Sequence, residues 1–275
     1  MLIDLTYHCS MGCTHCLSNC KPDNSHMPLR TLEDSFAFCN VHEIEAVSFS
    51  GGKIFEHPEI LQILDMIGMF LANRKKKRIP TAPTVLITNG RVLANTPEYL
   101  DAVVNLQKKI GKTEILLQVT DDPRFYPTKL TEKERYRLRK IGAIVEGVPG
   151  NPSDPNKCLY PQGRALENFQ EDANWNTVGP KCGNIRLLAK QLGTLHFGTL
   201  NKTMKMIGKI CTPVIAPNGD IKVGESALCP AVASIYDDGS EIVQKILNCN
   251  CRKCVIPFEK LRETKPEAYH MLISR

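Results

Sequence analysis

The first 150 residues alternate between short apolar segments and longer segments whose apolar residues recur at helical spacing. The apolar segments have the length and composition of buried strands, which we expect at residues 2–7, 45–50, 83–88, 114–120 and 143–148. The expected helices cover residues 58–72, 99–110 and 131–140, after a first helix that Thr31 and Asp34 would cap. This alternation predicts an α/β fold with a parallel sheet, and five or six such units fall short of a closed eight-fold barrel.

The loop after the first expected strand contains closely spaced cysteines. Cys9, Cys13 and Cys16 form a C-x3-C-x2-C pattern within eight residues. A [4Fe–4S] cluster normally takes four thiolates, so three can hold three irons and leave the fourth iron open to a ligand that is not protein. An open metal position is typical of a reactive site. A zinc site is the alternative, because His15 or Cys20 can complete a set of four ligands.

Two further motifs follow at the ends of expected strands. Residues 47–53 read Val-Ser-Phe-Ser-Gly-Gly-Lys, and residues 86–90 read Leu-Ile-Thr-Asn-Gly. With the cysteine triplet, these segments resemble the motifs of radical S-adenosylmethionine (radical SAM) enzymes, in the same order and at similar intervals. The resemblance implies a partial (β/α)6 barrel in which the open iron chelates S-adenosylmethionine. One electron from the cluster then cleaves this cofactor to methionine and a 5′-deoxyadenosyl radical, which abstracts a substrate hydrogen.

The resemblance also assigns the end of the second strand to the cofactor. The pair Gly51–Gly52 lets the backbone approach a ligand closely, because no Cβ obstructs it. Lys53 departs from the family pattern, which has a glutamate at this position. A lysine there would repel the ammonium group of the cofactor, so a contact of Lys53 with a carboxylate of the cofactor or the substrate is the alternative.

Other candidate cofactor residues follow the third and fourth strands. By resemblance, Thr88 and Asn89 border the cofactor. Thr120 and Asp121 are candidates for hydrogen bonds to its ribose hydroxyls, and a capped turn is the alternative. Arg164 lies in a Gly-Arg-Ala segment that resembles one common in relatives with a C-terminal cluster domain. Its guanidinium can bind the cofactor carboxylate, or it can form a structural salt bridge.

The region after residue 150 contains seven of the twelve cysteines. A hairpin signal at Asn218-Gly219 separates two of them, and a C-x-C-x2-C segment follows. This half resembles the Twitch module, a shortened relative of the SPASM domain, which implies one auxiliary [4Fe–4S] cluster. Four-thiolate zinc is the alternative. The assigned ligands are Cys211, Cys229, Cys251 and Cys254, with Cys249 as a rival of Cys251.

Composition adds limits on location and partners. No segment reaches the roughly 20 apolar residues of a membrane span, and the N-terminus does not resemble a signal peptide. We therefore expect a cytoplasmic protein, in which twelve cysteines favour metal ligation over disulfides. The net charge of +6 owes much to the basic run 74–78, which we interpret as a solvated helix end and not as a nucleic-acid patch.

These observations predict a radical SAM partial barrel over residues 1–180 and an auxiliary-cluster domain over residues 181–275. The predicted activity is that of an oxidoreductase or a related radical enzyme, which matures a ribosomally made peptide by cross-linking, oxidation or epimerisation. An electron donor such as flavodoxin or ferredoxin would supply the cluster. Three alternatives stay open: a small-molecule radical dehydrogenase of natural-product biosynthesis, a nucleic-acid-modifying radical enzyme and a zinc-binding interaction protein.

Overall fold

The structure is a computed structural model that describes residues 1–147, 163–168, 196–207, 212–225, 227, 229–249 and 263. The chain forms two compact units. The first unit comprises Met1–Cys13, Cys20–Val148 and Val214–Asp220. The second unit comprises Thr14–Asn19, Pro149–Pro213 and Ile221–Arg275. The predicted domain boundary at residue 180 lies outside the described residues.

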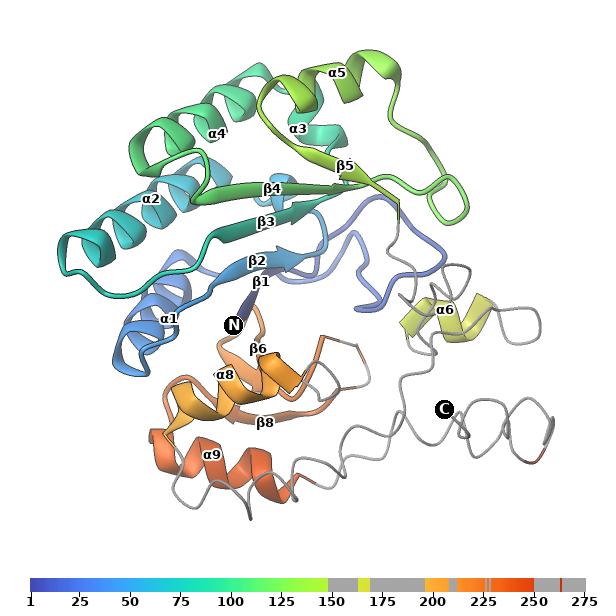
Figure 1. Ribbon diagram of the computed structural model, residues 1–275. Coiled ribbons are helices and arrows are strands. Elements are labelled where there is room, and N and C mark those ends of the chain that lie inside the picture. The colour runs from blue at the N-terminus through green and yellow to red at the C-terminus, as the bar shows by residue number, and fades with distance from the viewer. Residues whose placement is uncertain are drawn as a thin grey trace. The chain divides into compact units, whose positions relative to one another are not determined.

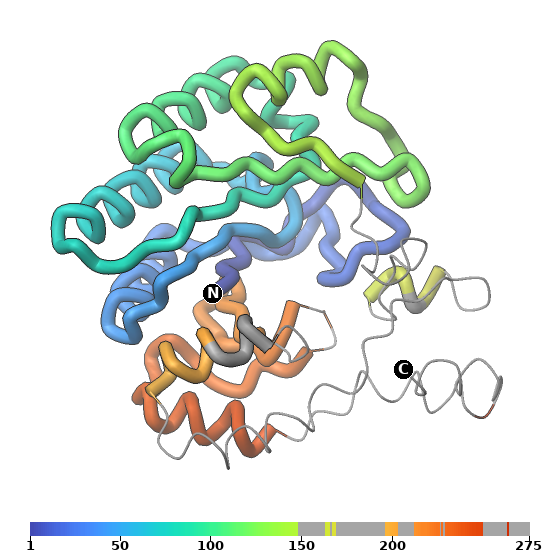
Figure 2. Tube along the Cα trace, viewed as in Figure 1, coloured from blue at the N-terminus to red at the C-terminus, as the bar shows by residue number. Residues whose placement is uncertain are grey.

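A parallel sheet forms the centre of the first unit, and its strands follow one another in the order β5-β4-β3-β2-β1-β6. Figure 2 traces β1 to β5 across this sheet in chain order. The prediction of a parallel α/β fold is confirmed. The strands are β1 (Leu2–Thr6), β2 (Ser48–Gly51), β3 (Thr84–Thr88), β4 (Ile115–Thr120), β5 (Ile144–Glu146) and β6 (Val214–Ile215).

Helices connect the strands and cover one face of this sheet (Figure 1). Each crossover from β1 to β5 advances the sheet in the same direction, and right-handed crossovers therefore place their helices on the same side. Apolar side chains such as Leu32, Ile63 and Val103 are buried between these helices and the sheet. The helices are α1 (Leu29–Val41), the 3₁₀ turn η1 (Ile54–Glu56), α2 (Ile60–Lys76), α3 (Arg91–Asn95), α4 (Pro97–Ile110) and α5 (Glu132–Lys140).

The start of α1 corrects one prediction. The helix begins at Leu29, directly after Pro28, and no side chain caps it. Thr31 is therefore inside the helix and is buried, so it does not cap the helix. The fixed φ of Pro28 and the missing N–H of its ring start the helix earlier than the Thr-x-x-Asp pattern indicates.

Strand β6 completes the sheet from a distant part of the sequence. Leu2 pairs with Val214 and Ile3 with Ile215, so β6 lies on the opposite side of β1 from β2. The predicted turn at Asn218-Gly219 is present: Ala216 donates its N–H to Asp220, and Gly219 has a positive φ of 87°. This turn leads from β6 into the second unit.

The second unit is described by several separate elements. Helix α9 buries one apolar face, and the carboxylate of Asp238 accepts a hydrogen bond from the N–H of Ser240 at its start. None of the helices in the described ranges combines the length and apolarity that crossing a membrane requires. The elements are α6 (Gly163–Asn168), α8 (Phe197–Ile207), β7 (Asp220–Lys222), β8 (Ala231–Ser234) and α9 (Gly239–Asn248).

The basic run at the end of α2 is not uniformly solvated. Arg74 is 1% exposed, and its Nη2 donates to the carbonyl of Ile44 at 2.8 Å and to the carbonyl of Pro80 at 3.3 Å. Its Nη1 donates to the side-chain oxygen of Asn40, and its guanidinium lies over the ring of Phe70. The four cations that follow are exposed. The interpretation of the run as a solvated helix end is therefore wrong for Arg74 and correct for residues 75–78.

Helix α5 begins with a capping box that predicts a measurable pH dependence. Thr131 Oγ1 accepts from the N–H of Glu134, whose carboxylate accepts from the N–H and hydroxyl of Thr131 and from the amide of Asn95. Burial raises the pKa of Glu134, but these hydrogen bonds outweigh burial and lower that pKa overall. The bonds therefore stabilise the fold above about pH 5, and this stabilisation is lost as the pH falls through the lowered pKa.

We expect Thr131→Ala to reduce the free energy of unfolding by about 1 kcal/mol at neutral pH, with a smaller loss in acid. Urea denaturation at pH 7 and pH 4 measures both values. Thr96→Ala is the matched control, because Thr96 precedes α4 without a capping side-chain hydrogen bond. Equal losses for the two variants, or a loss at Thr131 that does not depend on pH, would contradict this prediction.

Candidate functional site

The candidate residues of the first unit follow the carboxyl ends of its parallel strands. The cysteine loop follows β1, the glycine pair ends β2, Asn89 follows β3 and Asp121 follows β4. All carboxyl ends of a parallel sheet lie at one edge, which is where α/β proteins bind ligands. The pairing of Thr6 with Gly51 places the ends of β1 and β2 side by side at this edge.

The backbone of the cysteine loop is held on one side by residues 21–27. Tyr7 donates its N–H to Ser25 at 2.9 Å, and Cys9 donates to Lys21 at 3.0 Å. Lys21 donates in return to the carbonyl of Tyr7 at 3.2 Å. Cys9 and Cys13 are buried, with 7% and 6% of their surface exposed. The backbone up to Cys9 is thus hydrogen-bonded to residues 21–25.

The glycine pair holds the loop on its other side. Gly52 donates its N–H to the carbonyl of Thr6 at 2.6 Å, and Lys53 donates to the carbonyl of His8 at 3.0 Å. A Cβ on Gly52 would lie 2.0 Å from the His8 carbonyl oxygen and 3.1 Å from the Cβ of Cys9. A Cβ on Gly51, whose φ is +124°, would lie 2.1 Å from the carbonyl oxygen of Thr6. Glycine is therefore required here for contact between the two strand ends.

Lys53 is buried, and its side chain contacts Glu56, which is partly exposed, and Ser10, which is exposed. Its side chain is 6% exposed, and its Nζ donates to Glu56 Oε1 at 2.8 Å and to Ser10 Oγ at 2.7 Å. Glu56 also accepts from the Ser10 hydroxyl at 2.6 Å and from the Ser10 N–H at 3.0 Å. Burial raises the pKa of Glu56, but the hydrogen bonds from Lys53 and Ser10 outweigh burial and lower that pKa overall. These two hydrogen bonds use two of the three donors of the ammonium. The contact of Lys53 with the cofactor or the substrate stays a prediction.

Three histidine rings adjoin this group of residues. The rings of His8 and His26 stack at 5.0 Å, and His26 meets His57 edge-on at 4.9 Å. His8 Nε2 lies 3.6 Å from a carboxylate oxygen of Glu56. His57 accepts the N–H of Glu59 at Nδ1, so its Nε2 donates to the carbonyl of Met27 at 2.9 Å. Burial lowers the pKa of His57, and also that of His26 together with the neighbouring histidines.

Sequence reasoning did not identify Ser10, Glu56 or the three histidines as a group. The sequence does show that Lys53 and Glu56 are three residues apart. Side chains at this spacing lie on the same side of a 3₁₀ turn. The histidines are 18 and 31 residues apart along the chain. No local pattern indicates that such residues meet.

The end of β3 forms a tight turn. Thr88 is buried, and its Oγ1 accepts from the N–H of Gly90 at 3.2 Å. The side-chain oxygen of Asn89 accepts from the N–H of Arg91 at 3.2 Å, and Gly90 has a φ of +75° at the start of α3. A Cβ on Gly90 would lie 2.7 Å from Val119 of the neighbouring strand. The Thr-Asn-Gly motif therefore starts α3, which the sequence pattern did not predict.

The end of β4 is bonded to its own following segment. Asp121 is 6% exposed, and its carboxylate accepts from Arg135 of α5 and from the N–H of Leu130 at 3.2 Å. Thr120 pairs with Glu146 of β5. These bonds match the interpretation of the segment as a capped turn, and the proposed contact of both residues with ribose hydroxyls stays a prediction.

In the second unit, α6 holds the last part of the cysteine loop. Arg164 donates its backbone N–H to the carbonyl of Cys16 at 3.0 Å, and Asn168 donates its side chain to the carbonyl of Thr14 at 2.9 Å. A Cβ on Gly163 would lie 2.2 Å from the carbonyl oxygen of Cys16. The Gly-Arg-Ala segment is thus positioned against the backbone of the third cysteine of the triplet.

Residues 17 and 18, which follow Cys16, are hydrogen-bonded to residues 225 and 227 of the second unit. Ala227 donates its N–H to the carbonyl of Leu17 at 3.1 Å, and Ser18 donates its hydroxyl to the carbonyl of Glu225 at 3.0 Å. Cys229 is buried, and Cys249 directly follows α9. The other assigned auxiliary ligands, Cys211, Cys251 and Cys254, lie outside the described residues.

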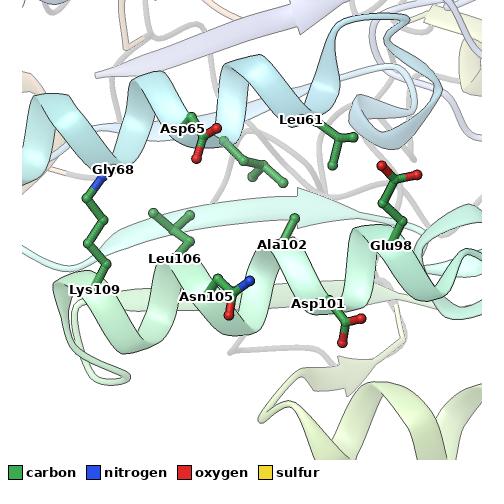
Figure 3. Close-up of a pocket in the computed structure, with 10 residues that line it drawn as sticks. Leu61, Asp65, Gly68, Glu98, Asp101, Ala102, Asn105, Leu106 and Lys109 are labelled. Carbon is green, nitrogen blue, oxygen red and sulfur yellow. The ribbon is translucent and has the colours of Figure 1, made fainter.

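A groove on the helical layer is distinct from these residues. It has a volume of about 590 Å³ and lies between α2 and α4, with Asp65, Glu98 and Asp101 among its polar residues (Figure 3). Its lining residues come from helices, whereas the candidate residues follow the strand ends. The groove therefore belongs to the outer layer of the first unit and not to the candidate site.

Comparison with solved structures shows a known fold. The structure titled "Native anSMEcpe with bound AdoMet and Cp18Cys peptide" matches 90% of this chain and 80% of its own, with a TM-score of 0.51 and 12% sequence identity. The protein anSMEcpe is a radical SAM enzyme. The chain has the radical SAM fold. No protein-family model matches the sequence, and no curated protein matches it.

Two further structures align with larger differences. SuiB from Streptococcus suis, bound to its precursor peptide SuiA, matches 88% of this chain and 63% of its own, with a TM-score of 0.42 and 13% identity. The FeFe-hydrogenase maturase HydG from Carboxydothermus hydrogenoformans matches 98% and 76%, with a TM-score of 0.40 and 13% identity.

The cysteine loop and Arg164 carry donor groups of the kinds that an iron–sulfur cluster and a carboxylate take. The cysteine loop supplies the thiolates that such clusters take. Within the described part of the chain, Nε and Nη2 of Arg164 are buried without a hydrogen-bond partner, and a carboxylate would satisfy both. No three His, Cys, Asp or Glu side chains among the described residues surround a common point. Cys9 and Cys13 belong to the first unit and Cys16 to the second.

Proposed function

We propose that this protein is a radical SAM enzyme in which Cys9, Cys13 and Cys16 bind a [4Fe–4S] cluster with one open iron. The observation that carries the proposal is the cysteine loop after β1, packed against Gly51–Gly52 at the carboxyl edge of a sheet with the radical SAM fold. When bound, the cluster and S-adenosylmethionine supply one electron and a 5′-deoxyadenosyl radical that abstracts a substrate hydrogen. The zinc alternative is less favoured, because the chain shares its fold with anSMEcpe, a radical SAM enzyme.

The residues of the chain bind and orient the cofactor. Gly52 exposes backbone beside Cys9, and Arg164 offers a bidentate donor pair to the cofactor carboxylate. Thr88 and Asn89 fix the turn after β3 with their side chains. We retain Thr120 and Asp121 as the proposed neighbours of the ribose.

The proposed substrate is a ribosomally made peptide. The support is the fold shared with anSMEcpe, whose structure holds a Cp18Cys peptide. We further propose that Cys211, Cys229, Cys251 and Cys254 bind an auxiliary [4Fe–4S] cluster. Such a cluster would accept the electron that a substrate radical loses when it becomes an oxidised or cross-linked product. Of these four ligands, only Cys229 lies within the described residues, and it is buried.

Anaerobic purification and reconstitution test this proposal. We expect a brown protein with about eight irons per chain, which forms 5′-deoxyadenosine from S-adenosylmethionine when dithionite is present. Peptides deuterated at Cα and Cβ should transfer deuterium to 5′-deoxyadenosine, as measured by mass spectrometry, and the same free amino acids should not. A colourless protein with stoichiometric zinc and no 5′-deoxyadenosine would refute the proposal. Deuterium transfer from small molecules alone would refute the peptide substrate.

A further inference from the structure

The buried ammonium of Lys53 raises a question that the proposed function does not answer. A lysine occupies the position where radical SAM relatives have a glutamate, yet its side chain is 6% exposed. Burial of an ammonium costs free energy unless the group is paired and hydrogen-bonded. A lysine is therefore tolerated at this position only with a partner of opposite charge.

The partner is Glu56, three residues further along the chain. The 3₁₀ turn η1 starts directly after Lys53, and Glu56 donates its N–H back to the Lys53 carbonyl at 2.8 Å. Buried Ile54 and Phe55 anchor this turn. The turn brings the two side chains onto one side, so the carboxylate of Glu56 lies beside the ammonium of Lys53. The pair has no net charge and does not repel the ammonium group of the cofactor.

The pair closes a ring of hydrogen bonds on the cysteine loop. The Ser10 hydroxyl accepts from Lys53 Nζ and donates to Glu56 Oε1, and the Ser10 N–H donates to Glu56 Oε2. Ser10 directly follows Cys9 and precedes Cys13 by three residues. Both carboxylate oxygens of Glu56 thus accept hydrogen bonds from Ser10, the first of the three residues between Cys9 and Cys13.

We propose that Lys53, Glu56 and Ser10 form a clamp that positions the loop between Cys9 and Cys13 for cluster binding. This inference rests on the proposed function. In this arrangement Lys53 acts on the cluster through Glu56 and Ser10, and it is a positioning residue and not a cofactor ligand. The glutamate of the family pattern and the lysine of this chain therefore have different tasks, although they occupy the same position.

The clamp makes a prediction opposite to that of a direct cofactor contact. Lys53→Glu restores the residue that is usual in the family, and a direct contact would then strengthen cofactor binding. In the clamp it places two carboxylates side by side beside Ser10, so the loop loses its fixed position. The double variant Lys53→Glu/Glu56→Lys restores opposite charges at the same two positions and should recover part of the cluster stability.

The experiment measures how fast a ferrous-iron chelator removes iron from the anaerobically reconstituted full chain. We expect Glu56→Gln, Lys53→Met and Lys53→Glu to release the iron of the N-terminal cluster about 10- to 100-fold faster than the wild type, as for other residues that orient metal ligands. Ser10→Ala keeps the ion pair and should give a smaller acceleration. Urea denaturation of each variant separates loss of the clamp from loss of the fold.

Glu33→Gln is the matched control, because Glu33 pairs with Arg30 at the same i, i+3 spacing on the exposed face of α1. It should release iron at the wild-type rate. Wild-type release from a folded Glu56→Gln or Lys53→Glu variant would overturn the clamp while leaving the proposed function intact. If Glu56→Gln does not fold, Ser10→Ala decides, and wild-type release from that variant overturns the clamp. A wild-type chain that binds no iron overturns the proposed function, and the clamp with it.

Discussion

We expect the replacement of Cys13 by alanine to abolish the formation of 5′-deoxyadenosine and to lower the iron content from about eight to about four per chain. Two thiolates cannot hold the three irons that the proposed open-site cluster requires, so that cluster should be lost while the proposed auxiliary cluster remains. Iron and sulfide analysis and product quantification by mass spectrometry measure the two effects. The loss should equal that of Cys9→Ala and exceed that of any substitution in the first unit that leaves the three thiolates in place, because a cluster ligand is removed directly.

Cys39→Ala is the control for this prediction. Cys39 is fully buried in α1, and burial raises the pKa of its thiol to about 11, although the N-terminal ammonium and Arg74 act in the opposite direction. The side chain is therefore a thiol near neutral pH, whereas cluster ligands are thiolates. We expect Cys39→Ala to keep the full iron content. Equal iron contents for Cys13→Ala and Cys39→Ala would contradict the assignment of Cys13.

Gly52→Ala has the second largest expected effect. The new Cβ would lie 2.0 Å from the carbonyl oxygen of His8, and this obstacle is backbone and not a flexible side chain. Either the end of β1 or the end of β2 must move, and Cys9 moves with it. We expect the free energy of unfolding to fall by about 1–3 kcal/mol, together with faster loss of iron to a chelator. Urea denaturation and iron analysis check both results.

Gly68→Ala in the middle of α2 provides the comparison. Its Cβ would lie 3.1 Å from the Cδ1 of Leu106, which is the end of a flexible side chain. Alanine also favours a helix by up to about 1 kcal/mol relative to glycine. We expect this variant to stay within about 1 kcal/mol of the wild type. If Gly52→Ala is as stable as Gly68→Ala and keeps its iron, the two strand ends do not need to be in contact.

The regular elements of the first unit were largely visible in the sequence. Apolar runs marked all five strands from β1 to β5, and periodic segments marked α2, α4 and α5 within a few residues of their ends. These signals are local, because one face of each element must be buried wherever the element lies. The short helix α3 was missed, since its five residues are too few for a periodic pattern.

Contacts between distant residues were not predictable in the same way. The basic run 74–78 gave no sign that Arg74 is buried among backbone carbonyls of residues 44 and 80, while its neighbours are exposed. The two residues of β6 pair with β1 across more than 200 positions of sequence. Such pairings depend on which surfaces meet after folding, and one residue's local pattern does not contain that information.

The amino-acid sequence alone specifies the order of strands and helices, because hydrophobic periodicity is a local property. It also specifies the spacing of Cys9, Cys13 and Cys16, which suits the coordination chemistry of an iron–sulfur cluster. Only the tertiary structure decided where the side chain of Lys53 points. The lysine is buried beside Glu56 and Ser10 because η1 turns the chain back toward the end of β1. The partner of a buried charge is chosen by the three-dimensional neighbourhood, which residue order alone does not specify.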